Sequence, residues 1–201
     1  MFYTIQKNVS YEIVEKKSKF IANIFYVESK EEAEEMIKKV SKQYHDAKHN
    51  CYAYRIFTKE GIIEKASDNG EPSGTASAPM LTILAKQQLA NILVVVTRYF
   101  GGILLGTGGL VRAYSSACTL ALEQAEMIQK NIMEEYKIEI KYEDIDQFKY
   151  FAKKYNMLIL KEEYLENVIF YVAIPEKILL KKFSENEILV KKIEFLKEIY
   201  I

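Results

Sequence analysis

The feature that most constrains the fold is a buried-type strand running directly into a cluster of glycines, "NILVVVTRYFGGILLGTGGLVRAYSSA" (91–117). The valines predict a buried strand, and small apolar residues at helical spacing predict a helix from about Leu110. Five of the eight glycines fall in residues 98–117, which contain no carboxylate. A glycine loop ahead of a helix exposes N–H groups where the helix dipole favours an anion. A tight turn with close helix packing explains the same glycines, and the sequence leaves both interpretations open.

Two arginines bracket these glycines. Arg98 ends the strand, and Arg112 lies in the first helical turn, where the dipole disfavours a cation unless an anion binds nearby. Both could instead pair with Asp68 or Glu71 for structural reasons. The candidates for anion or nucleic-acid binding are Arg98, Gly101, Gly102, Gly106, Thr107, Gly108, Gly109, Arg112 and Lys86. The spacing is neither a Walker loop, which needs Lys-Ser or Lys-Thr after the glycines, nor a GxGxxG dinucleotide fingerprint.

A second loop, "SDNGEPSGTASAP" (67–79), is also rich in Gly, Ser and Thr. Its turn sequences predict two consecutive turns. Alternatively, its two carboxylates bind a metal or the arginines of the first loop, and its hydroxyls contact an anion. The candidate rim residues are Asp68, Glu71, Ser73 and Thr75. Two carboxylates without a third ligand are weak evidence for a metal, so we expect neither a metal nor a cofactor.

The segment "HDAKHNCYAY" (45–54) places His49 two residues before Cys51. A structural zinc site normally needs four ligands, and nothing brings the other thiol, Cys118, close. A thiol activated by His49 is conceivable, but strand neighbours two apart rarely align in that way. We favour a buried Cys51 with a hydrogen-bonded His49, and we assign no catalytic residue.

The composition restricts the setting and the partners. The net charge is zero, so any nucleic-acid site must be a local patch rather than a global basic excess. The N-terminus does not resemble a signal peptide, and the apolar stretches are too short to span a membrane. Two cysteines are too few for a disulfide framework, so we expect a reduced, cytoplasmic setting.

The glycines also divide the chain, because the residues after Gly109 contain none. We expect two domains, 1–131 and 132–201. The first combines two strands within 10–27, a helix over 29–44 with Ser29 and Glu32 as a capping box, paired strands at 50–57 and 61–67, and a helix over 80–90. The second has the order βαββαβ, with its elements predicted at 132–142, 144–155 (Asp144 as N-cap), 157–165, 167–175, 176–186 and 189–200. That order is typical of the ferredoxin-like fold, and the overall class is α+β.

Four segments together resemble the YigZ/IMPACT family: "FIANIFYVESKEEAEEMI", "HNCYAYR", "SDNGEPSGTASAPML" and "NILVVVTRYFGGILLGTGGLVRAYSSA". The resemblance covers the first 130 or so residues densely, and the tail is similar to the second domain of bacterial members. Where members usually carry a second Asp and a final Gly in the third motif, this chain has Asn69 and Ser77. The loss of one carboxylate weakens the idea of a metal site there.

The resemblance implies a two-layer N-terminal domain with a left-handed βαβ crossover, similar to domain IV of elongation factor G and to a small-subunit ribosomal protein. It implies a C-terminal domain similar to domain V of that factor. The expected partners are therefore RNA, the ribosome or a translation factor, with DNA unlikely. Eukaryotic members are linked to translational control through a separate N-terminal domain that we do not expect here, so that activity is not carried over.

Three classes of function remain open. The first is an RNA- or ribosome-associated protein in translation regulation that uses the glycine loop and arginines. The second is an enzyme acting on a nucleotide or phosphorylated small molecule, against which the absence of a phosphate lysine and of a clear base counts. The third is a protein-interaction module with structural glycine loops. We favour the first, which is not an enzyme.

Overall fold

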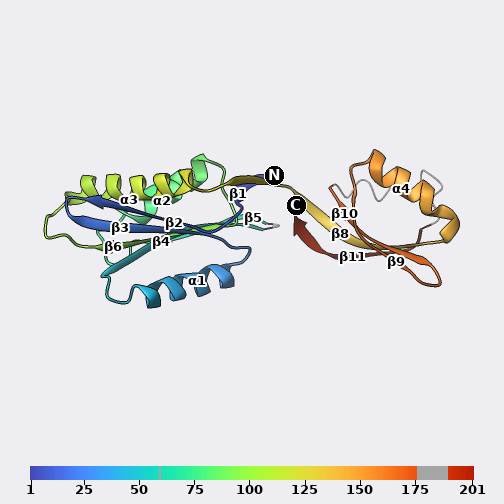
Figure 1. Cartoon of the computed structure of the whole chain (residues 1–201), viewed down its shortest axis with the longest axis horizontal. Coiled ribbons are helices and arrows are strands. Elements are labelled where there is room, and N and C mark those ends of the chain that lie inside the picture. Colours follow the sequence, from blue (N-terminus) through green and yellow to red (C-terminus); the bar gives the residue numbers. More distant parts are fainter. Residues whose placement is uncertain (59, 176–189) are drawn as a thin grey trace. The chain divides into compact units, whose positions relative to one another are not determined.

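The computed structural model describes residues 1–58, 60–175 and 190–201, in which the chain forms two compact units, Phe2–Gln129 and Lys130–Ile201 (Figure 1). Both units combine helices with sheets, which confirms the predicted α+β class. None of the helices in these residues is long and apolar enough to cross a membrane.

The N-terminal unit is built on a five-stranded sheet in the order β2-β3-β6-β4-β5, with every neighbouring pair antiparallel. Its strands are β2 (Val9–Glu15), β3 (Ser18–Tyr26), β4 (His49–Thr58), β5 (Gly61–Ser67) and β6 (Ile92–Tyr99). The predicted pairing of 50–57 with 61–67 is confirmed. A separate two-stranded sheet joins β1 (Phe2–Ile5) to β7 (Met127–Lys130).

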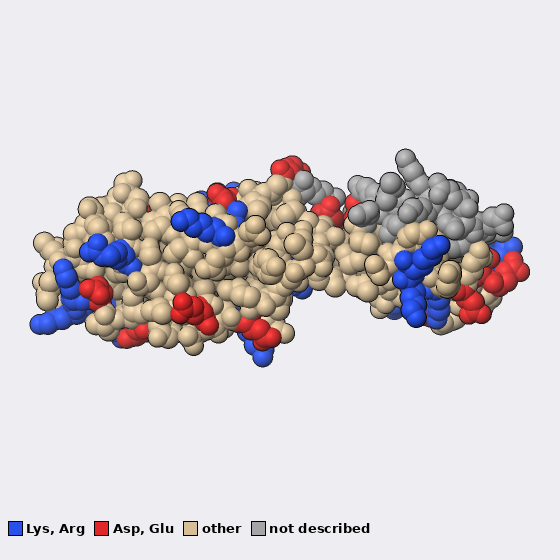
Figure 2. All heavy atoms as spheres, turned by 90° about the horizontal axis from the view of Figure 1, so that it is seen from above, with Lys and Arg blue, Asp and Glu red and all other residues tan. Residues whose placement is uncertain are grey.

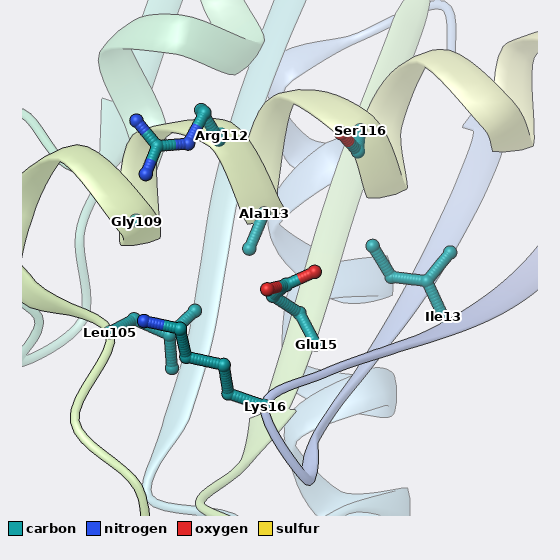
Figure 3. A pocket seen from close by; sticks show the side chains of 8 residues that line it. All are labelled: Ile13, Glu15, Lys16, Leu105, Gly109, Arg112, Ala113 and Ser116. Carbon is teal, nitrogen blue, oxygen red and sulfur yellow. The ribbon is translucent and has the colours of Figure 1, made fainter.

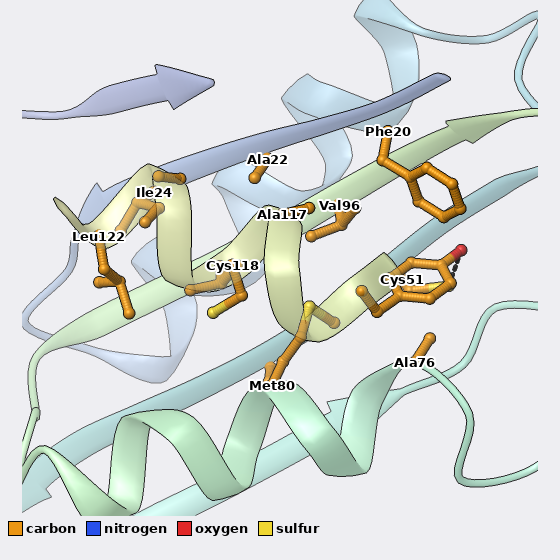
Figure 4. Packing of buried hydrophobic residues seen from close by; sticks show 14 of the residues in the cluster. Phe20, Ala22, Ile24, Cys51, Ala76, Met80, Val96, Ala117, Cys118 and Leu122 are labelled. Carbon is orange, nitrogen blue, oxygen red and sulfur yellow. Dashed lines mark hydrogen bonds between the residues drawn. The ribbon is translucent and has the colours of Figure 1, made fainter. Parts of the chain in front are cut away.

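Helices cover both faces of this sheet, α1 (Lys30–Gln43) on one and α2 (Ser77–Lys86) with α3 (Gly106–Glu123) on the other (Figure 1). Strand β6 is apolar throughout because it is buried on both sides. Val96 packs with Ala117, Cys118 and Met80 beneath the α2/α3 layer (Figure 4), whereas Val95 belongs to the cluster under α1. The sheet therefore lies between two layers of helices. This makes three layers in all, whereas the family resemblance implies two.

Helix α1 connects β3 to β4, which are both antiparallel to the β6 strand between them and so run parallel to each other. This is a βαβ crossover, and its left hand stays a prediction. The helix begins as predicted, because Ser29 Oγ accepts a hydrogen bond from Glu32 N at 3.1 Å. The Glu32 carboxylate in turn accepts from Glu28 N at 2.8 Å. This capping was predictable because both partners lie within one turn.

The second unit has a four-stranded antiparallel sheet in the order β11-β8-β10-β9, the order of the ferredoxin-like fold. Its elements are β8 (Ile132–Ile140), η1 (Tyr142–Asp144), α4 (Ile145–Lys154), β9 (Leu158–Tyr164), β10 (Val168–Ile174) and β11 (Val190–Tyr200). The helix predicted at 176–186 lies outside the described residues. Asp144 is the N-cap residue of α4, as predicted, although its side chain makes no capping hydrogen bond within the described residues.

Candidate functional site

The loop after β5 and the end of β6 meet in a buried ion pair. Arg98 Nη1 lies 2.7 Å from Glu71 Oε1, and both side chains are less than a tenth exposed. Tyr114 of α3 donates its hydroxyl to the same carboxylate oxygen at 2.9 Å. Of the two roles considered for Arg98, the structure therefore places it in the structural pair, where Glu71 neutralises its charge.

Cys51 lies at the inner end of this network. Its Sγ is 3.3 Å from the Tyr114 hydroxyl and 2.9 Å from the carbonyl oxygen of Asp68. Burial raises the pKa of the Cys51 thiol to about 12, so the thiol stays protonated near neutral pH. His49 makes its own contact, 2.9 Å from Nδ1 to the Asn69 carbonyl oxygen. Each residue thus has a structural partner, as the favoured interpretation predicts.

The second loop is held together by Asp68, which accepts three backbone hydrogen bonds. Its Oδ2 accepts from Gly74 N at 2.7 Å, and its Oδ1 accepts from Ala76 N at 3.0 Å and Ser77 N at 2.8 Å. Burial alone would raise the pKa of this carboxyl, but the backbone donors outweigh burial and hold the pKa below its usual value. Asp68 therefore caps α2 from a distance, which explains why that helix begins at Ser77 rather than at the predicted residue 80.

The other candidates of this loop point to a structural role for the loop. Thr75 Oγ1 donates to the Pro72 carbonyl oxygen at 2.7 Å, closing a turn, and Ser73 is exposed. Among the described residues, no group of three or more His, Cys, Asp or Glu side chains is arranged to hold a metal ion.

The glycines that follow β6 have two different functions in the fold. Gly101 lies against the β2–β3 turn, where an added Cβ would come within 1.9 Å of the Lys17 carbonyl carbon, so only glycine fits. Gly102 stays in the loop with a positive φ of 87°, whereas Gly106, Gly108 and Gly109 lie inside α3, which begins at Gly106 rather than near Leu110 as predicted. Gly109 makes room for Leu105, the N-cap residue of the same helix, since a Cβ on Gly109 would stand 2.9 Å from the Leu105 Cβ.

A pocket of about 220 Å³ lies between the start of α3 and the β2–β3 hairpin (Figure 3). Arg112 and Gly109 approach it from the helix, and Lys16 and Glu15 approach it from the hairpin (Figure 3). We call it the Arg112 pocket; its full lining is Ile13, Glu15, Lys16, Leu105, Gly109, Arg112, Ala113 and Ser116. Within the described part of the chain, the Arg112 side chain makes no hydrogen bond or ion pair. The pocket thus carries two cations and one carboxylate.

Only part of the predicted constellation comes together in this pocket. Arg112 and Gly109 line it, whereas Arg98 is paired with Glu71 and Lys86 ends α2 without lining it. Sequence reasoning missed Lys16. The available signal was its place in the β2–β3 turn, where Lys16 and Lys17 have positive φ values of 45° and 65°, a conformation usually taken by Asn or Gly in such turns. The packing of that hairpin on α3 could not be predicted from the sequence.

The arrangement can bind an anionic group. Among the described residues, no side chain caps the first N–H groups of α3, so the positive end of this helix can attract an anion. Arg112 and Lys16 add positive charge, which Glu15 reduces without cancelling. A volume of about 220 Å³ is below the roughly 300–1,000 Å³ of ordinary small-molecule sites and suits one phosphate-sized group.

Comparison with known proteins places the chain in a family. Residues 16–122 match the model of the Impact N-terminal domain. IMPACT family member YvyE of Bacillus subtilis (strain 168) is 38% identical over 88% of this chain and 81% of its own length. IMPACT family member YigZ of Escherichia coli (strain K12) is 35% identical over 80% of this chain and 79% of its own. A crystal structure described as a hypothetical protein superposes with a TM-score of 0.65, at 30% identity, covering 98% of this chain and 96% of that one. The chain belongs to the IMPACT family.

Proposed function

We propose that this chain is a cytoplasmic RNA- or ribosome-associated protein that acts in translation regulation. The observation that carries the proposal is the Arg112 pocket, in which Arg112 and Lys16 lie beside the uncapped start of α3 (Figure 3). In this proposal a backbone phosphate of RNA occupies the pocket, and the chain has no catalytic residue.

The position of Arg112 supports a phosphate as its partner. The sequence predicted Arg112 in the first helical turn, but α3 begins at Gly106 and Arg112 lies in its second turn. Its side chain lines the pocket and has no hydrogen-bond or ion-pair partner among the described residues, so it is available to an anion. Lys16 has a backbone cost, because a lysine with positive φ occupies backbone space that favours glycine or asparagine. Strained residues that surround a site are typical of function.

The surroundings favour RNA over a nucleotide substrate. The pocket is small. In the Cys51–Tyr114 network, burial raises the pKa of both the thiol and the hydroxyl, so both stay protonated near neutral pH, and the Glu71 carboxylate is held by Arg98. In Figure 2 basic side chains lie at the end of the N-terminal unit that carries the β2–β3 turn, with acidic ones among them. Family membership supports a partner in translation, since the sequence motifs resemble a family with translation-factor folds.

The test compares wild type with the Lys16→Ala/Arg112→Ala double variant. Affinity for a fluorescently labelled single-stranded RNA and for purified ribosomes is measured over a series of salt concentrations. We expect the double variant to bind about tenfold more weakly, and the slope of log K against log salt to become less negative by about 0.7, as the single-strand phosphate contact in the pocket is lost.

The matched control removes two lysines from the opposite helical layer, Lys39→Ala/Lys42→Ala in α1. This variant has the same net charge as the pocket variant, and its affinity should stay close to that of wild type. Equal binding by all three proteins would contradict the proposal. A rise in melting temperature with nucleotide and magnesium, without RNA binding, would favour the enzyme instead.

A further inference from the structure

The loop between β6 and α3 is exposed and apolar, next to the Arg112 pocket. Three of its side chains stand in solvent: Phe100 is 53% exposed, Ile103 42% and Leu104 83%. Loops normally carry polar residues at the surface, so an apolar group held out by the backbone suggests a binding role. The three side chains differ in what they contact, and the contacts of Phe100 suggest its role.

Phe100 alone among them is backed by a fixed cation. The guanidinium carbon of Arg98 lies 5.6 Å from the centre of the Phe100 ring. Arg98 is itself held by its ion pair with Glu71 and lies 5.5 Å from the buried Phe20 ring. Phe100 is nevertheless about half exposed, so part of its ring surface is open to solvent. A buried network thus holds an aromatic ring that is partly open to solvent.

The backbone at Phe100 is fixed as well. The next residue, Gly101, donates its N–H to Ser18 Oγ at 3.1 Å and lies directly against the Lys17 backbone. This contact ties the loop to the β2–β3 turn. The exposed lysines of that turn, Lys16 and Lys17, are therefore neighbours of the segment that carries the ring.

We infer that Phe100 is a stacking platform for an unpaired base of RNA. The inference rests on the proposed function and names its substrate class: single-stranded or looped RNA rather than a regular duplex. A rigid aromatic ring beside cations is the combination that binds single strands, because bases stack on the ring while the cations hold the backbone. In a duplex the bases are already stacked on one another, so the platform has no free base to take.

The chain contains no tryptophan, so Phe100→Trp places a single indole at the platform. Stacking of a base on the indole quenches its fluorescence. We expect an oligoadenylate to quench the indole fluorescence of the Phe100→Trp variant on binding, and a duplex of the same length to quench it much less. The matched control is Leu104→Trp, in the same loop but without the Arg98 contact, which we expect to be quenched weakly.

Affinity provides the second measurement. Phe100→Leu keeps the apolar bulk and removes the aromatic face, and we expect it to weaken single-strand binding by about tenfold, within the range found for base–aromatic stacking. Phe100→Tyr keeps the face and should bind like wild type. Phe100 is half exposed, so neither change disturbs the core.

The outcomes separate this inference from the proposed function. If Phe100→Leu binds RNA like wild type while Lys16→Ala/Arg112→Ala binds weakly, the platform is wrong and the proposed function stands. If wild type binds neither RNA nor ribosomes, the proposed function fails first. If Phe100→Leu and Leu104→Ser lower ribosome affinity equally without changing oligoadenylate affinity, the loop docks on a protein and the inference is overturned.

Discussion

Glu71 accepts hydrogen bonds from two buried donors, the Arg98 guanidinium and the Tyr114 hydroxyl. Its truncation in Glu71→Ala leaves the guanidinium buried without its counter-charge. Breaking a buried pair from one side typically costs about 3–5 kcal/mol, and we expect a loss of unfolding free energy of that order in urea titration. Because Arg98 also backs Phe100, the same change should weaken RNA binding.

The matched control is Ser73→Ala, an exposed residue of the same loop, which should change the unfolding free energy by less than about 0.5 kcal/mol. Glu71→Gln keeps an acceptor oxygen and should fall between the two. A loss below about 1 kcal/mol in Glu71→Ala would show that the buried Arg98–Glu71 pair contributes little to the stability of the fold.

Single residues also mark the limit of sequence reasoning. The sequence named Glu71 as a partner for the arginines, but it could not choose between that pair and an anion site. The choice depends on the β6 end meeting the second loop across 27 positions of sequence, which is a property of the sheet order. Lys16 was missed for the same reason, since its closeness to Arg112 arises only when the hairpin packs on α3.

At the scale of elements, the sequence predicted the helix start that depends on neighbouring residues, and it misplaced two other helix starts. The Ser29–Glu32 cap of α1 lies within one turn and was predictable. The start of α2 was misplaced because its cap, Asp68, is eight residues before the Ala76 N–H that it holds. The start of α3 was misplaced because glycines are poor helix formers, whereas here Gly106, Gly108 and Gly109 form the first turn of the helix.

The cap of α2 by Asp68 predicts a dependence of stability on pH. The pKa of this carboxyl in the fold lies below its ordinary value of 3.8. Its stabilising contribution is therefore fully present at pH values above 3.8 and is lost as the pH falls through the lower, folded pKa. Asp68→Asn removes the charge and places an amide near the Gly74 N–H, so we expect a loss of about 1 kcal/mol near neutral pH.

Chemical unfolding at a series of pH values checks this prediction. The difference between wild type and Asp68→Asn should be constant from pH 7 down to about pH 5 and should shrink toward acid pH. Asp46→Asn gives the comparison for an exposed carboxyl away from any helix start, which accepts a hydrogen bond from the Tyr99 hydroxyl. That hydroxyl also lowers the pKa of Asp46, so this difference should shrink toward acid pH too, but it should stay smaller than that of Asp68→Asn. A difference that grows toward acid pH would contradict the capping role.

At the scale of the whole molecule, each unit has its own hydrophobic core. The N-terminal core joins β3, β4 and β6 to α2 and α3, with a second cluster under α1, while a separate cluster joins α4 to β8 and β10. The proposed RNA-binding residues, including Arg112, Lys16 and Phe100, all belong to the N-terminal unit. Folding and binding by that unit are therefore expected to need only its own residues.

This leads to a prediction for the fragment of residues 1–130, which includes the β1–β7 pair. Because the fragment keeps both clusters that cover its sheet, we expect cooperative thermal unfolding by circular dichroism and salt-dependent binding to single-stranded RNA. The same fragment carrying Lys16→Ala/Arg112→Ala should unfold at a similar temperature and bind about tenfold more weakly. A fragment that folds but does not bind RNA would indicate that the RNA-contacting residues lie in the C-terminal unit. A fragment without a cooperative transition would show that the N-terminal core needs residues beyond Lys130.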